Sequence, residues 1–222
     1  MAASRSFAWR TAASIGALCW ASVAAAGPAE LATEWRDLQA RCGAAVARGA
    51  GLDLSGLREA APEFTYDRRV TDGTRRYLAP NAATVGGRIV PRVFERPEGA
   101  LRLRLIEHPT RPGTRAICEV VPRGALDPDV AGALLDAFRA MKGSALEQGG
   151  WQDKTLRSDA TVTREGMVTT APNVRGCPVI AQITVRADQG DVRSSVSEMA
   201  GAPGCGGPSL LARPAPARGE DT

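Results

Sequence analysis

The chain has 222 residues, 44% of them hydrophobic, and a formal net charge of +4. Two of the positive charges, Arg5 and Arg10, lie near the N-terminus and the rest of the chain is nearly balanced, so its charge predicts no nucleic-acid partner. The sequence has one histidine, no Cys-x-x-Cys pair and no glycine-rich loop between a strand and a helix, so we predict neither a metal nor a cofactor.

Residues 1–26 have the pattern of a secretory signal peptide. The two arginines form a positive start, residues 11–23 are mostly small and apolar, and the three alanines at 24–26 provide a cleavage site. We therefore predict cleavage before Gly27 and a mature protein that is periplasmic or secreted.

Two alternatives for this leader are an uncleaved membrane anchor and a lipoprotein that carries its lipid on Cys19. The apolar run is shorter than the roughly 20 residues that span a bilayer. Leu18 precedes Cys19, where a lipidation site has a small residue. Both observations favour a cleaved leader, and no later stretch of the sequence reads as a transmembrane segment.

Export changes what the remaining cysteines predict. In an oxidising compartment, four cysteines favour two disulfides over a metal site. A turn at residues 188–190 joins two strand-like runs and brings Cys177 and Cys205 to the same end of a hairpin. We therefore predict the disulfide Cys177–Cys205 and, by elimination, Cys42–Cys118.

The mature chain begins with an expected helix over residues 30–48. Its apolar residues recur at helical spacing on one side: Leu31, Trp35, Leu38, Cys42 and Val46. A short packed turn is expected at residues 52–63. Apolar and polar alternation, with turn residues between the runs, then predicts strands over 64–70, 75–78, 84–95, 100–107 and 115–121.

The second half begins with an expected helix over residues 129–146, opened by Asp127 and Pro128. A loop then leads to three expected strands, 160–170, 178–186 and 191–199. Residues 206–222 are rich in glycine, proline, alanine and charge, which predicts a disordered tail. The sequence thus predicts a single α+β domain over residues 27–205.

Two amphipathic helices beside antiparallel strands predict an α+β fold with two layers. The helices are expected on one face of the sheet, which leaves the other face open. The order of a helix and then three strands occurs in residues 30–121 and again in 129–199, so a degenerate duplication of this unit is an alternative account of the fold.

The strongest strand signal lies at residues 101–109, where leucine and arginine alternate. Side chains in a strand alternate between the two faces of the sheet. We expect the three leucines, Leu101, Leu103 and Leu105, to face the helices, while Arg102 and Arg104 face outward. The same stretch holds the lone histidine, His108, at its end.

The open sheet face is the candidate binding surface. Five guanidiniums on it would suit a carboxylate or phosphate group: Arg88, Arg92, Arg102, Arg104 and Arg115. The competing interpretation is that these arginines are solvated and paired across strands with Glu95, Glu107 and Glu119. On the second-half strands we expect the exposed residues to be Gln182, Thr184, Arg193, Ser195 and Ser197.

The sequence offers little for catalysis. It contains no Gly-x-Ser-x-Gly nucleophile motif, and a Ser-His-Asp site would have to use His108. Our leading hypothesis is an exported, non-enzymatic protein that binds an envelope protein or an anionic ligand through its open sheet face. The alternative is a small exported hydrolase with an atypical site near His108 and Glu107.

Overall fold

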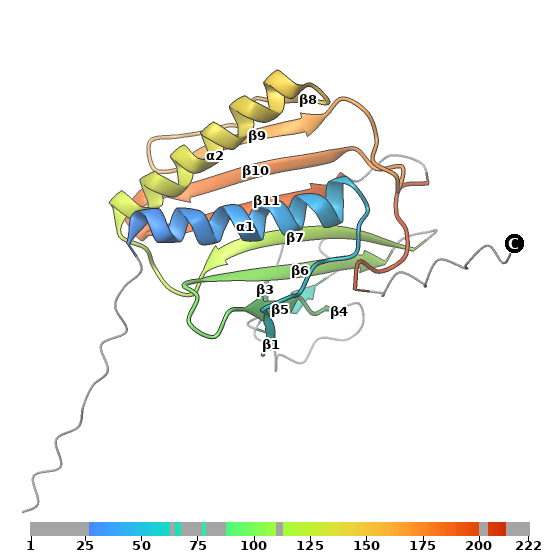
Figure 1. The fold of residues 1–222 in the computed structure, drawn as a ribbon, viewed down its shortest axis with the longest axis horizontal. Helices are drawn as coiled ribbons and strands as arrows, with labels where there is room; N and C mark the ends of the chain where they lie inside the picture. The colour runs from blue at the N-terminus through green and yellow to red at the C-terminus, as the bar shows by residue number, and fades with distance from the viewer. Residues whose placement is uncertain are drawn as a thin grey trace, which may run out of the picture.

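Two helices lie side by side on one face of an antiparallel sheet (Figure 1). They are α1, Pro28–Ala47, and α2, Pro128–Gln148. The computed structural model describes residues 27–62, 65–67, 77–78, 88–109, 113–199 and 204–211. The predicted signal peptide, residues 1–26, therefore lies outside the described residues.

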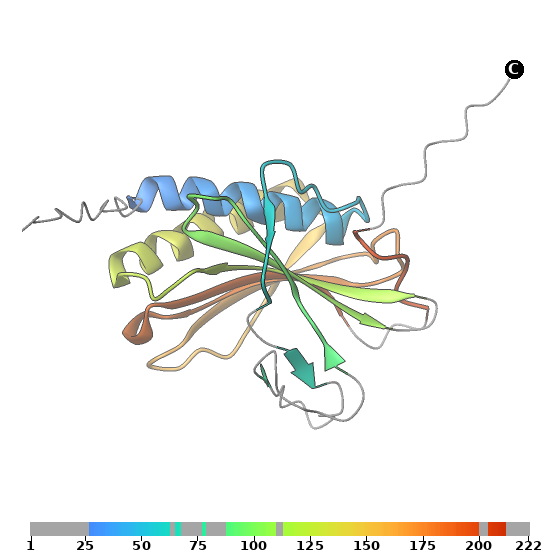
Figure 2. The ribbon, with the colours of Figure 1, turned by 90° about the horizontal axis from the view of Figure 1, so that it is seen from below.

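The main sheet has the strand order β1-β5-β6-β7-β11-β10-β9-β8, and every neighbouring pair is antiparallel. Its strands are β1 Arg58–Ala60, β5 Arg92–Glu95, β6 Leu101–Pro109, β7 Thr114–Pro122, β8 Trp151–Lys154, β9 Thr163–Thr169, β10 Val179–Arg186 and β11 Asp191–Glu198. Seen edge-on, both helices lie above the sheet (Figure 2). The predicted two-layer α+β sandwich with its helices on one face is confirmed.

The order of elements is the same in the two halves of the sheet. A helix is followed by four strands that pair in sequence, and the last strands of the two halves, β7 and β11, pair with each other. At that junction Cys118 lies opposite Val196. Each half thus has one strand more than the predicted unit, and an origin by duplication stays a prediction.

The extra strands are the short edge strands β1 and β8, which the sequence analysis expected as a packed turn and a loop. With three and four residues, they are too short to show a clear alternation. The expected strand 84–95 also differs, because it divides into β4, Arg88–Ile89, and β5. Only β5 belongs to the main sheet.

Strand β4 belongs to a second, small sheet with β2, Thr65–Asp67, and β3, Tyr77–Leu78. This small sheet lies on the opposite side of the main sheet from the helices (Figure 2), and β4 contacts β6. The outer face, by which we mean the main-sheet face turned away from α1 and α2, is therefore not open along its whole length. This corrects the expectation of a fully open face.

The core lies between the helices and the sheet. Leu101, Leu103 and Leu105 are buried in it, as predicted, and α1 contributes Trp35, whose ring lies 6.4 Å from that of Phe138 on α2. These leucines fix the other face of β6 as the side that can carry polar groups.

Both predicted disulfides are confirmed. Cys42–Cys118 joins α1 to β7, with 5.4 Å between the Cα atoms, and Cys177–Cys205 closes the end of the β10–β11 hairpin with 4.7 Å. The turn of that hairpin is Ala187–Gln189 followed by Gly190, which has a positive φ of 61°. A Cβ at Gly190 would lie 2.2 Å from the Leu126 carbonyl oxygen, so this turn requires glycine.

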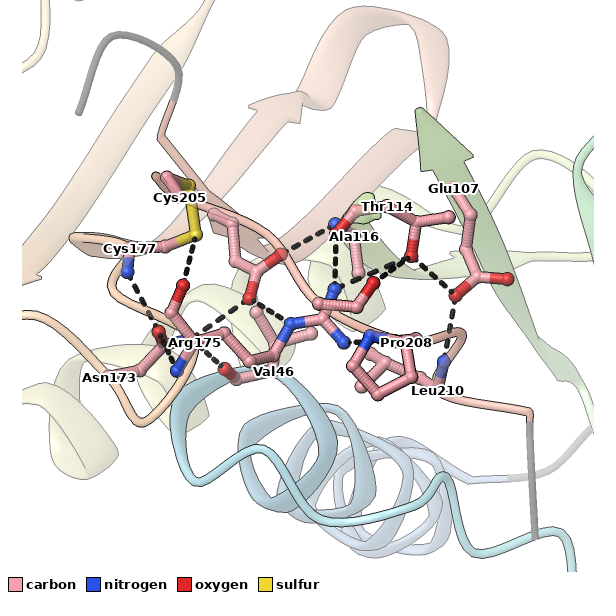
Figure 3. Close-up of polar contacts among 12 residues, drawn as sticks. Val46, Glu107, Thr114, Ala116, Asn173, Arg175, Cys177, Cys205, Pro208 and Leu210 are labelled. Atoms are coloured by element: carbon pink, nitrogen blue, oxygen red, sulfur yellow. Dashed lines mark hydrogen bonds and ion pairs between the residues drawn. A yellow bond between two sulfur atoms is a disulfide. The ribbon is translucent and has the colours of Figure 1, made fainter. Parts of the chain in front are cut away.

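Residues 204–211 pack against the sheet and the helices. Thr114 N–H donates to Gly207 O at 2.7 Å, and Gly207 N–H donates back to Thr114 O at 3.0 Å. Leu210 is 3% exposed, and its N–H donates to the Glu107 carboxylate at 2.8 Å (Figure 3).

These contacts correct the prediction of a disordered tail for residues 206–211. The composition of the segment is typical of disorder, but Leu210 fills a place in the core and the disulfide at Cys205 holds the chain beside the sheet. The rest of the predicted tail, residues 212–222, lies outside the described residues.

Candidate functional site on the outer sheet face

A polar hollow of about 630 Å³ lies on the outer face of β7, β11, β10 and β9. Alternation in β10 and β11 directs Gln182, Thr184, Arg193, Ser195 and Ser197 to this side, while Ala181, Ile183, Val192 and Val196 face the helices. We call it the outer hollow, and its lining residues are Ile117, Glu119, Arg164, Gln182, Thr184, Arg186, Asp191, Arg193, Ser195 and Ser197.

The charges of the outer hollow favour an anion. Three guanidiniums stand against two carboxylates, and the remaining polar lining residues are hydroxyls and one amide. Arginine presents a planar fork of donors that matches a carboxylate or a phosphate. Serine, threonine and glutamine add groups that can hydrogen-bond the hydroxyls of a ligand.

Glu119 lies at the inner side of the outer hollow. It is 3% exposed, and it stands opposite Arg104 on one neighbouring strand and Ser195 on the other. Its Oε2 atom has no hydrogen-bond partner among the described residues. A buried carboxylate oxygen in that situation costs free energy, and a donor on a ligand would recover it.

A smaller hollow of about 240 Å³ adjoins the outer hollow and shares Asp191 and Arg193 with it. It extends to Arg104, which is 9% exposed. Burial lowers the pKa of the Arg104 guanidinium, and the nearby Arg193 charge acts in the same direction, while Glu119 and Asp191 oppose the shift. The two hollows therefore form one charged surface across the middle of the sheet.

The structure places only part of the predicted arginine set on this surface. Arg102, Arg104 and Arg115 lie on the outer face, as their strand positions predicted. Arg102 donates to the Glu95 carboxylate at 2.9 Å, so the predicted pairing of an arginine with Glu95 is present. Of the three, Arg104 alone lines a described hollow.

The other two predicted arginines are elsewhere. Arg92 stands opposite Leu105, which faces the helices, so Arg92 is on the opposite face from Arg104. There it pairs with Glu59 through two hydrogen bonds of 2.7 Å. The backbone of Arg88 lies in β4 of the small sheet. The expectation that all five arginines share one surface is therefore wrong.

The second-half strands match their prediction more closely. All five residues expected to be exposed there line the outer hollow: Gln182, Thr184, Arg193, Ser195 and Ser197. The hollow is also lined by three residues that were not predicted from the sequence, Arg164, Arg186 and Asp191. Extending the alternation by one step at the ends of β10 and β11 would have found Arg186 and Asp191.

The residues of the hydrolase site considered near His108 do not lie together on one face of the sheet. Adjacent strand residues point to opposite faces, and Glu107 is on the helix side, where it accepts hydrogen bonds from Ser209 and Leu210. His108 lies opposite Arg115 at the strand end and is not among the residues that line the outer hollow.

A second buried glutamate, Glu198, lies on the helix-covered side beneath Arg175. The Arg175 Nε and Glu198 Oε1 atoms are 2.7 Å apart, and the same carboxylate accepts from Ala116 N–H at 2.8 Å and from Asn173 Nδ2 at 3.0 Å. Figure 3 shows Arg175 at the centre of these contacts, reaching Pro208 and Thr114 with its other nitrogens. This cluster ties the C-terminal segment to the fold.

Compared with models of known families, with curated proteins and with solved structures, the chain matches none of them. Within the described ranges, no helix is long and apolar enough to cross a membrane. No group of three or more metal-ligating side chains occurs in the part of the chain that the structure describes.

Proposed function

We propose that the protein is an exported, non-enzymatic binding protein that holds an anionic, hydroxyl-rich ligand in the outer hollow. The observation that carries the proposal is the concentration of three guanidiniums, hydroxyls and an amide in one concave surface of about 630 Å³. A volume of this size is within the range of small-ligand sites. A concave surface also suits a compact ligand better than the flat face of an envelope protein.

Two further features support export. Disulfides persist in oxidising compartments, and this chain has two. The signal-peptide pattern of residues 1–26 agrees with this location.

The direct test is calorimetric titration of the purified, oxidised protein with trigalacturonic acid, an acidic trisaccharide. Maltotriose serves as the neutral ligand of similar size. We expect the acidic sugar to bind with a dissociation constant below about 1 mM and the neutral sugar to bind at least tenfold more weakly, because the guanidiniums pair with carboxylates.

The variants Arg186→Glu and Arg193→Glu test the location. Each reverses a charge in the outer hollow, and each should weaken binding of the acidic sugar by tenfold or more. The matched control is Arg36→Glu, since Arg36 is exposed on α1 on the other side of the molecule. Equal affinity for the two sugars, or equal loss in Arg36→Glu, would overturn the proposal.

A further inference from the structure

The two helices diverge toward their C-terminal ends (Figure 1). A groove of about 460 Å³ is lined by residues of both helices and of the sheet beneath them. At the narrow end, Trp35 and Phe138 bring α1 and α2 into contact. We call this the interhelical groove, and it is separate from the outer hollow because it opens on the other side of the sheet. Its lining residues are Gln39, Ala40, Gly43, Ala44, Ala47, Arg48, Met141, Ala145, Gln148, Trp151, Met167, Ala181 and Val196.

Most of this lining is apolar. Small side chains of α1 form one wall, Met141 and Ala145 of α2 form the other, and three buried sheet residues form the floor, Met167, Ala181 and Val196. A Cβ built on Gly43 meets no atom within 4 Å, so the wall is open at this point. The groove therefore offers space for an apolar molecule.

One polar group is built into the narrow end of the groove. Trp35 Nε1 donates to Ser194 Oγ at 2.9 Å, and Ser194 Oγ donates to Gln39 Oε1 at 2.9 Å. In this chain the single proton of the serine hydroxyl is engaged with the amide oxygen of Gln39. The Gln39 Nε2 group is left as the donor.

That donor is unsatisfied. Gln39 is 2% exposed, and its Nε2 atom has no hydrogen-bond partner among the residues that the structure describes. A buried N–H without an acceptor is costly, and native structures contain few of them. An acceptor oxygen on a bound molecule would satisfy it.

We propose that the interhelical groove binds a neutral, mainly apolar carbonyl compound whose oxygen accepts a hydrogen bond from Gln39 Nε2. The oxygen has to be neutral because the one charged lining residue, Arg48, is exposed at the wide end, beyond the reach of the narrow end. Nine residues of helix separate Gln39 from Arg48, or about 13 Å along the axis. A buried anion at Gln39 would lack a countercharge.

The test compares acetophenone with ethylbenzene, two molecules of nearly the same shape that differ in the carbonyl oxygen. Both are titrated into the oxidised protein and followed by ¹H–¹⁵N NMR. We expect acetophenone to bind roughly 3- to 10-fold more tightly, the gain of one net hydrogen bond. We also expect the Gln39 side-chain amide signals to shift with acetophenone and to stay in place with ethylbenzene.

Two variants test the hydrogen-bond donor and the space in the groove separately. Gln39→Leu should bind both compounds with equal affinity, since it removes the donor and keeps an apolar wall. Gly43→Leu should abolish binding of both compounds by filling the groove, and the open space at its Cβ lets the chain fold. Gly143→Leu is the matched control, because Gly143 is an exposed helical glycine outside the groove.

The proposal is overturned if the two compounds bind wild type equally or not at all. It is also overturned if Gly43→Leu binds acetophenone as wild type does. These outcomes are independent of the outer hollow, so the acidic-sugar titration can succeed or fail separately.

Discussion

Glu198 on the helix side of the main sheet and Glu119 on its outer face are both buried, but their carboxylates have different surroundings. On the helix side, Glu198 has a side-chain exposure of 0%, and Arg175, Asn173 and the Ala116 N–H surround its carboxylate. On the outer face, Glu119 is 3% exposed, and one of its oxygens has no hydrogen-bond partner among the described residues.

This difference separates a group that holds the fold together from a group that, on our proposal, is left to bind a ligand. A buried charge with all its hydrogen bonds made stabilises a particular arrangement, and removal of one partner leaves the other charge uncompensated. A buried charge with a free oxygen costs stability, and proteins retain such groups mainly where a ligand or a reaction uses them. The predictions below compare how the charged groups and links of the two faces contribute to the free energy of unfolding.

The largest effect should come from Arg175→Met on the helix side. It leaves Glu198 buried without its cation, and we expect a loss of about 3–5 kcal/mol in the free energy of unfolding. Arg102→Met on the outer face is the matched variant. Glu95 there also pairs with Arg58 and Arg123, so the loss should stay below about 1 kcal/mol. Urea unfolding measures both, and equal losses would show that Arg175 contributes no more to the stability of the fold than Arg102 does.

Removal of either disulfide should have an effect of similar size. Replacing Cys42 and Cys118 by alanine releases a loop with a sequence separation of 76, and replacing Cys177 and Cys205 releases one of 28. Loop entropy predicts losses of about 4.5 and about 3.6 kcal/mol. The urea unfolding midpoints of the two double variants measure these two losses. A greater loss for the shorter loop would show that the helix-side link matters less than its loop length implies.

The smallest expected effect is the pH dependence that Glu95, on the outer face, gives to the free energy of unfolding. Burial opposes its ionisation, but hydrogen bonds from Arg102 and Arg58 and the Arg123 charge outweigh burial, so the pKa of Glu95 lies below its usual value. The ionised form is then favoured by folding. Its contribution is complete above the usual glutamate pKa of about 4.3 and is lost as the pH falls through the folded-state pKa.

We expect this contribution to be about 1 kcal/mol or less, because Arg58 is largely exposed. Urea unfolding of wild type and Glu95→Gln between pH 3 and 7 measures it. The difference in stability between the two proteins should shrink as the pH falls. A difference that is constant across this range would show that the arginine cluster does not favour the charged form.

The sequence was sufficient to predict the two layers of this fold. The leucine–arginine alternation of β6, the helical spacing of Leu31, Trp35 and Leu38, and the hairpin that brings Cys177 to Cys205 are local patterns that depend on chain geometry. Each of them is present in the structure.

What could not be predicted depends on contacts between distant segments. Arg92 lies in a strand whose register is set by its pairing with β6, and an error of one residue moves a side chain to the other face. Leu210 lies in a segment whose composition is typical of disorder. Its burial depends on a space in the core that the rest of the fold leaves for it. The free donor of Gln39 results from a hydrogen-bond chain that joins α1 to β11.

The central claim is that the outer hollow is the binding surface, and mapping the acidic trisaccharide on the protein by ¹H–¹⁵N NMR tests it most directly. Backbone amides of β9, β10, β11 and the middle of β7 should shift together and saturate at one dissociation constant, while those of α1 and α2 stay unchanged. Shifts confined to the helices or spread evenly over the surface, or no saturable shift at all, would contradict the claim.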